Sequence, residues 1–260
     1  EIVWSIMQKA LPITLAANDE FLVLHDGESV VCLDRADGSV VWRSQKIDRH
    51  PKLQGFFAPT LVLADDIVLF AGGEKSGSQS GGWIREDDTM TGLDVRSGKV
   101  IWTAPHPPSG YRSPEDVLVI DGLVWTGETT SGGAVGRWTG RDLHTGEIVH
   151  EFVPDVNTYW FHHRCYRAKA TDNFLLTSRT GVEFIDMNDE NYHWDINHWV
   201  RGACLYGILP ANGLLYAPQH PCACYLESKL AGFNALAPAA SGERISKELA
   251  AKPRLEKGPA

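Results

Sequence analysis

The sequence predicts an all-β fold, a β-propeller assembled from four-stranded antiparallel blades. Two repeated patterns and one absence predict it. The segment Leu33–Trp42 returns as Leu93–Trp102, and a hairpin of two apolar strands precedes each copy. Helical periodicity is nearly absent before the last residues of the chain. Repeats that recur at intervals of several tens of residues are typical of propeller blades.

Each copy of the repeated segment predicts a strand, a tight turn and a second strand. In the first copy, Asp34 ends a strand, Gly38 supplies the positive φ of the turn, and two valines lead to Trp42. A weaker copy covers Asp142–His150. The last copy, Asp186–Trp194, is eroded because Glu190 stands where the turn glycine is expected.

The second pattern is an apolar hairpin with a polar turn. Its copies surround Asn18–Glu20 and cover Leu61–Phe70, Val117–Trp125, Arg167–Leu176 and Gly207–Tyr216. Two hairpins per repeat give four strands, so about five blades are expected. A sheet that is apolar on both faces must stack on its neighbours, and the aromatic residue that ends each repeat is expected to fill the space between blades.

Composition excludes several classes of partner. The net charge of −9 argues against binding to nucleic acid or to an anionic membrane surface. No apolar run is long enough to span a membrane. The hydrophobic content of 43% is sufficient for a large core.

The sequence also predicts how the chain is divided. Glu1–Trp4 matches the tail of the repeat, so we expect the chain to start within a blade, with further blades elsewhere in the same protein. Residues 1–240 are expected to form the propeller. Residues 241–260 are charged and contain proline, and they are expected to form a linker or excursion.

The two most regular copies, Leu33–Trp42 and Leu93–Trp102, resemble pyrroloquinoline quinone (PQQ)-like propeller repeats. That family includes quinoprotein alcohol and glucose dehydrogenases and an outer-membrane assembly lipoprotein. The resemblance covers about residues 1–240 and implies a propeller, usually of seven or eight blades, in a periplasmic or secreted protein. Many members bind no quinone, so the resemblance implies the fold more than the function.

Histidines and cysteines gather in the last two repeats. The candidate metal ligands there are Cys165, Cys204, Cys222, Cys224 and His220. Aligning the hairpins on Asn173 and Asn212 places Cys165 on Cys204. Three interpretations stay open: a disulfide from Cys165 or Cys204 to Cys222 or Cys224, a metal site with Cys and His ligands, or ordinary buried thiols.

The stretch Trp160–Arg167 is the densest polar and aromatic segment of the chain. If it lies on an inner strand, a planar anionic quinone such as PQQ would be held by Trp160, His162, His163, Arg164 and Arg201. The acid–amide pairs at 155–157 and 195–197 are the ligands that an accompanying Ca²⁺ would need, although such pairs are more often turn residues. The alternative is that these arginines balance acidic residues and the rings fill space between blades.

The preferred function is a non-catalytic binding or scaffold propeller, with residues 160–225 as the face that holds a protein partner or small ligand. One alternative is a quinoprotein-type oxidoreductase that binds PQQ on the propeller axis. Another is a metal-binding propeller that uses the Cys and His residues.

Overall fold

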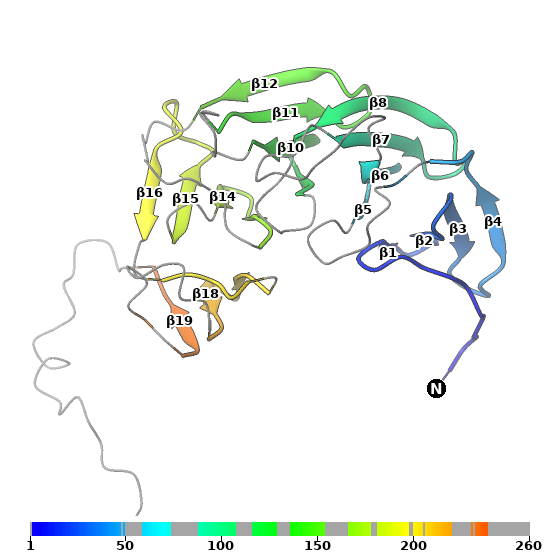
Figure 1. Ribbon diagram of the computed structural model, residues 1–260, viewed down its shortest axis with the longest axis horizontal. Coiled ribbons are helices and arrows are strands. Elements are labelled where there is room, and N and C mark those ends of the chain that lie inside the picture. The colour runs from blue at the N-terminus through cyan, green and yellow to red at the C-terminus, as the bar shows by residue number, and fades with distance from the viewer. Residues whose placement is uncertain are drawn as a thin grey trace, which may run out of the picture.

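The computed structural model describes residues 2–47, 49, 59–73, 88–107, 116–128, 136–153, 166–177, 181–197, 200–204, 206–219, 230 and 232–238. Regular secondary structure in these ranges consists of strands, which form five antiparallel sheets. The sheets follow one another around an arc (Figure 1). This arrangement confirms the predicted all-β propeller. Residues 241–260 lie outside the described ranges.

Each sheet is a simple meander in which neighbouring strands are consecutive in the chain. The first sheet contains β1 (Leu15–Ala17), β2 (Phe21–His25), β3 (Val30–Asp34) and β4 (Val40–Arg43). The second contains β5 (Thr60–Ala64), β6 (Ile67–Gly73), β7 (Asp88–Asp94) and β8 (Val100–His106). The third contains β9 (Leu118–Ile120), β10 (Leu123–Gly127), β11 (Trp138–Asp142) and β12 (Ile148–Phe152).

The last two sheets belong to the second half of the chain. The fourth contains β13 (Lys169–Ala170), β14 (Phe174–Thr177), β15 (Val182–Asp186) and β16 (Trp194–Asn197). The fifth, as far as the structure describes it, contains β17 (Leu209–Ala211), β18 (Leu214–Ala217) and β19 (Asn234–Leu236). No helix long and apolar enough to cross a membrane occurs among the described residues.

The first strand of each sheet lies nearest the centre of the arc. Strand β1 contacts β5, and β13 contacts both β9 and β17. The first hairpins close with tight turns, as predicted. In the third sheet, Asp121 and Gly122 both have positive φ, at 50° and 73°, which is the geometry of a type I′ hairpin turn.

Tryptophan and glycine join neighbouring sheets. Trp42 from the first sheet lies against Gly98 of the second, and its indole Nε1 donates a hydrogen bond of 2.7 Å to the carbonyl oxygen of Val95. Trp102 repeats this contact one sheet further on, with a 2.9 Å hydrogen bond to the carbonyl oxygen of Leu143. These contacts confirm that the aromatic residue at the end of the repeat fills the space between blades.

Trp4 makes the same contact with the first sheet. Its Nε1 donates a 2.8 Å hydrogen bond to the carbonyl oxygen of Arg35, and its ring covers Gly38. This is the contact expected of a tryptophan that ends a repeat.

The hydrophobic core lies between adjacent sheets. One cluster joins the first two sheets and includes Val23, Cys32, Trp42, Val68 and Phe70. Similar clusters fill the next three interfaces. Because the apolar side chains are covered by the neighbouring sheet, a single sheet would expose them to water, and the array is stabilised as a whole.

The interface between the third and fourth sheets departs from the regular pattern. His150 takes the position that tryptophan holds in the first two sheets, and its ring is hydrogen-bonded to the hydroxyl of Tyr192. The ring of Tyr192 also stacks on Phe152, with centroids 3.9 Å apart. The turn closed by the Ile185–Trp194 pair is longer than its counterparts, and its positive φ of 49° falls on Tyr192. Where the sequence pattern is eroded, Tyr192 contacts His150 and Phe152 in place of the regular contact between tryptophan and glycine.

Candidate functional site

Most of the residues predicted to form a site lie outside the described ranges. These residues are Trp160, His162, His163, Arg164, Cys165, His220, Cys222 and Cys224. Their roles in binding a quinone, a metal or a disulfide partner stay predictions. The structure describes the remaining two candidates, Arg201 and Cys204.

Arg201 and Cys204 lie together at the start of the fifth sheet. Arg201 is 1% exposed, and its Nε donates a 3.3 Å hydrogen bond to the carbonyl oxygen of Gly202. Its Nη2 lies 3.8 Å from the sulfur of Cys204. The structure thus brings the predicted arginine and one predicted cysteine into contact.

The segment that carries Arg201 and Cys204, which is closed by a bridge between Ala203 and Gly207, packs closely against Tyr166 at the start of the fourth sheet. The Tyr166 hydroxyl donates a 3.0 Å hydrogen bond to the carbonyl oxygen of Gly181 and accepts one of 3.5 Å from the backbone of Gly202. A Cβ atom on Gly207 would lie 2.9 Å from the Tyr166 ring. The close approach holds Arg201 and Cys204 in a fixed position between the two sheets.

The alignment that placed Cys165 on Cys204 is wrong by one residue. In the fourth sheet the backbone N–H of Thr171 donates to the carbonyl of Phe174, so Asp172 and Asn173 form the hairpin turn. In the fifth sheet Ala211 pairs with Leu214, which leaves Asn212 and Gly213 in the turn. Asn173 is the second residue of its turn and therefore corresponds to Gly213 and not to Asn212. The sequence shows that a turn is present but does not show which two residues form it.

Among the described residues, no group of three His, Cys, Asp or Glu side chains is placed to hold a metal ion. The only other described cysteine, Cys32, is buried in the core between the first two sheets and is not in a disulfide. Burial, helped by the charge of Asp34, raises the pKa of the Cys32 thiol to about 11. Cys32 is a structural thiol and not part of the predicted cluster.

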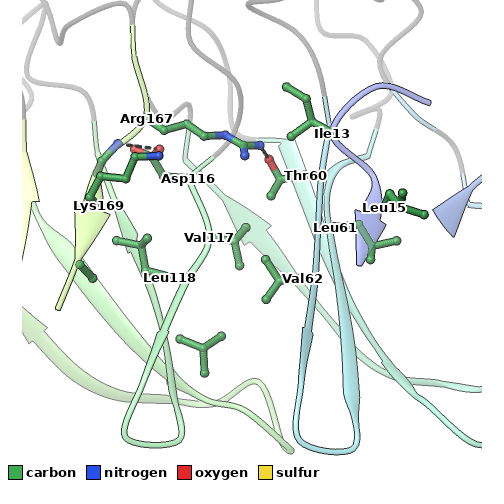
Figure 2. Close-up of a pocket in the computed structure, with 13 residues that line it drawn as sticks. Ile13, Leu15, Thr60, Leu61, Val62, Asp116, Val117, Leu118, Arg167 and Lys169 are labelled. Carbon is green, nitrogen blue, oxygen red and sulfur yellow. Dashed lines mark hydrogen bonds between the residues drawn. The ribbon is translucent and has the colours of Figure 1, made fainter. Parts of the chain in front are cut away.

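A pocket of about 530 Å³ opens where the first strands of the sheets meet. We call it the channel pocket, and it is lined by Ile13, Leu15, Thr60, Leu61, Val62, Asp116, Val117, Leu118, Val119, Arg167, Ala168, Lys169 and Ala170 (Figure 2). Thr60, Asp116 and Arg167 occupy equivalent positions in the second, third and fourth sheets. Each lies five residues before the first residue of the turn that closes the first hairpin of its sheet. This common register explains why residues far apart in the chain share one end of the pocket.

Polar contacts in the channel pocket link three sheets. The guanidinium of Arg167 donates a hydrogen bond to the hydroxyl of Thr60, so it joins the fourth sheet to the second. The backbone N–H of Ala168 donates a 3.0 Å hydrogen bond to Oδ1 of Asp116 in the third. His106 Nε2 lies 2.7 Å from the backbone oxygen of Asp116. Asp116 is only 2% exposed, and these contacts bind both its carboxylate and its backbone oxygen.

Lys169 brings a second cation to this end of the pocket. Burial lowers its pKa, the charge of Arg167 lowers it further, and the charge of Asp116 opposes the shift. Within the described part of the chain, no hydrogen bond or ion pair engages the Lys169 ammonium group. Two cations face one carboxylate here, although the chain as a whole carries a net charge of −9.

Sequence reasoning did not select Thr60, Asp116 or Lys169, and it treated Arg167 only as part of a polar and aromatic stretch. A signal was available. Aligning the first hairpins by their turn residues places Thr60, Asp116 and Arg167 at one position. The polar character of that position points to the channel.

The comparisons with known proteins agree with this architecture. The family model for the outer membrane protein assembly factor BamB matches residues 1–153. The comparison with curated proteins found no match.

Among solved structures, BamB from Moraxella catarrhalis is similar with 15% identity and a TM-score of 0.54, over 82% of this chain and 57% of that chain. The computationally designed Ika8 protein has 13% identity and a TM-score of 0.50, over 82% of this chain and 57% of its own. Quinohemoprotein alcohol dehydrogenase from Comamonas testosteroni has 12% identity and a TM-score of 0.48, over 78% of this chain and 43% of that chain.

At these identities the similarities to the Moraxella catarrhalis and Ika8 proteins show the fold alone. The chain spans little more than half the length of the Moraxella catarrhalis protein. The family model covers more than half of this chain and rests on the same repeats that form the first three sheets. The chain therefore belongs to the family of PQQ-like β-propellers represented by the outer membrane protein assembly factor BamB.

Proposed function

We propose that this chain is a non-catalytic binding propeller that holds a protein partner at one end of its array of sheets. The observation that carries the proposal is the difference between the two ends. At one end, which we call the turn end, tight turns such as Asp121–Gly122 connect the strands. The turn that follows Asp34 is closed by a 2.8 Å hydrogen bond to the carbonyl of Ser39 and is covered by tryptophan.

At the opposite end, which we call the loop end, β4, β6, β8 and β12 finish and the strands that follow them in the chain begin. The segments that join these strand ends are the long connections of the sequence. The channel pocket has its charged residues at this end. Connections held on a rigid scaffold are the usual place for binding residues, so the loop end is the side that we assign to the partner.

Exposed apolar side chains favour a protein as the partner. Tyr206, which precedes the first strand of the fifth sheet, is 83% exposed. Ile13 occupies a similar place before the first sheet and is also exposed. Aromatic and aliphatic side chains of this kind are common anchors in protein interfaces. Residues 160–225, the predicted functional face, include Tyr206 and the segment that leads into the fourth sheet.

The family description supports the same proposal. It names an outer membrane protein assembly factor, which suits a protein partner and a periplasmic setting next to the outer membrane. A small ligand and a protein partner are compatible, because the channel and the long connections are neighbouring parts of the same end.

The described residues do not by themselves form a quinone site. The channel pocket supplies cations but no aromatic ring among its lining residues, and Arg201 is not one of them. A planar cofactor would need rings to stack against. The quinoprotein alternative therefore depends on Trp160, His162, His163 and Arg164, outside the described residues.

Photo-crosslinking tests the proposal. A photoreactive phenylalanine analogue at position 206 is expected to give a discrete crosslinked protein in cells, identified by mass spectrometry. The same analogue at position 99, which is exposed at the turn end and has no positive φ, is the matched control. Equal crosslinking at both positions, or none at position 206, would overturn the assignment. Addition of PQQ and Ca²⁺ should give no dye-linked alcohol oxidation, and such activity would favour the oxidoreductase instead.

A further inference from the structure

The channel pocket has two chemically distinct parts. Figure 2 shows the polar groups of Arg167, Lys169 and Asp116 at one end. The side chains of Val62, Val117 and Leu118 line the wall away from them. Hydrogen bonds that only joined the sheets would not need an apolar cavity wall beside them. The combination of a charged end and an apolar wall therefore points to a ligand.

We propose that the channel pocket binds a monocarboxylate with an apolar tail, with the carboxylate at Lys169 and the tail along the aliphatic wall. The charged residues of the pocket lie at the loop end, but this proposal rests on Lys169 and the aliphatic wall and not on Tyr206, so neither proposal depends on the other.

The charge of the site favours a monoanion. Among the described residues that line the pocket, Arg167 and Lys169 contribute two positive charges and Asp116 one negative charge, so a single added negative charge neutralises these three groups. Arg167 is already directed to Thr60, and Asp116 already accepts the hydrogen bond from Ala168. Lys169 is the cation whose three donor hydrogens are engaged by no described residue, so it is the group assigned to the incoming carboxylate.

The wall favours an aliphatic tail. Leu15, Leu61, Val62, Val119 and Ala170 present methyl groups and no polar side-chain atoms to the cavity. A volume of about 530 Å³ is within the range of small-molecule pockets. Apolar surface that a ligand buries contributes in proportion to its area, so a longer tail should bind more tightly until the wall is covered.

Isothermal titration calorimetry of the full chain with a series of straight-chain carboxylates, from acetate to octanoate, tests the proposal. Affinity is expected to rise about fourfold for each added CH₂ group that the wall buries. Octanamide, which has the same tail but no charge, is expected to bind at least about tenfold more weakly than octanoate because its neutral carbonyl oxygen cannot form an ion pair with the Lys169 ammonium.

Variants test whether Lys169 receives the carboxylate. Lys169→Met removes the charge but retains a long apolar side chain, and it is expected to weaken octanoate binding about tenfold with little effect on octanamide. Lys169→Arg should restore most of the affinity. Lys99→Met is the control, since Lys99 is exposed at the turn end and lies outside the pocket.

A second arm identifies the source of the carboxylate. An acetylated tripeptide that ends in leucine with a free carboxylate is compared with the same peptide as its amide. Tighter binding of the acid than of both its amide and octanoate would assign the site to a peptide C-terminus; tighter binding of octanoate would assign it to a free fatty acid. Absence of octanoate and peptide binding, or affinity that changes with neither tail length nor Lys169→Met, would overturn the proposal. Either result leaves the crosslinking at position 206 unaffected.

Discussion

Replacement of Gly98 by alanine tests the joint that holds the sheets together. Gly98 lies in the turn of the second sheet with a φ of 69°, and the indole of Trp42 covers it. A Cβ atom at this position would lie 2.4 Å from the ring, which is far inside van der Waals contact. The substitution therefore combines backbone strain with a steric overlap that only a shift of the tryptophan can relieve.

The two effects can be separated. A left-handed backbone conformation costs an alanine about 1–2 kcal/mol. Forcing a well-packed side chain to move costs about 1–3 kcal/mol more. Gly122 is the matched control, because its φ is 73° but no atom lies within 4 Å of its Cβ position. Gly98→Ala should therefore reduce the free energy of unfolding by about 2–5 kcal/mol, and Gly122→Ala by only about 1–2 kcal/mol.

Urea unfolding followed by tryptophan fluorescence measures both variants, and a double variant sharpens the comparison. In a Trp42→Leu background the additional effect of Gly98→Ala should largely disappear, because the overlap is gone. Equal destabilisation by Gly98→Ala and Gly122→Ala in the otherwise unchanged chain would show that the packing of Trp42 on Gly98 contributes nothing beyond the turn itself. That result would refute the reasoning for the other tryptophan contacts as well.

Three further predictions concern single buried groups. Burial lowers the pKa of His25 to about 4, below the value of about 6.5 in an unfolded chain. The unfolded state therefore takes up the proton first, and the free energy of unfolding falls by up to about 3 kcal/mol as the pH drops from about 6.5 to about 4. In urea unfolding, a His25→Phe variant should lack this part of the pH dependence, and an unchanged pH dependence would contradict the assignment. Trp102→Phe removes the donor to the buried carbonyl of Leu143 and should destabilise the chain by about 1–3 kcal/mol, whereas wild-type stability would show that the hydrogen bond has no net value. Cys32 is fully buried with its pKa raised to about 11, so iodoacetamide at about pH 8 should modify it only after unfolding, as peptide mass spectrometry would show; rapid modification of the folded chain would contradict its burial.

Much of the fold could be predicted because its signals are local. The sequence Asp-x-x-x-Gly followed by β-branched residues and an aromatic residue predicts a turn at Asp34–Gly38 and at Asp94–Gly98, and Gly38 and Gly98 both have the positive φ that the turn requires. The candidate site was harder to predict. Density of His, Cys and aromatic residues directed attention to residues 160–225, but the polar group at the channel pocket also draws on Thr60 and Asp116, each an ordinary residue in its own repeat.

The register error has the same origin. Asn173 and Asn212 look equivalent in the sequence because each follows an apolar strand and sits in a polar turn. Hydrogen bonding across the hairpins shows that one is the second residue of its turn and the other the first. Cross-strand pairing decides this, and a shift of one residue changes which side of a strand a neighbouring side chain occupies.

The sequence by itself determined the repeating unit of this protein, its turns, and the tryptophan that ends each regular repeat, because these depend on backbone preferences and alternating hydrophobicity within short segments. The tertiary structure alone decided which residues meet across the channel and between sheets. Arg167 reaches Thr60, and His150 binds Tyr192 where a tryptophan and glycine meet elsewhere. Such contacts depend on how the sheets stack around a common centre. The number of residues between two side chains in the sequence does not show how far apart they lie after the sheets have stacked.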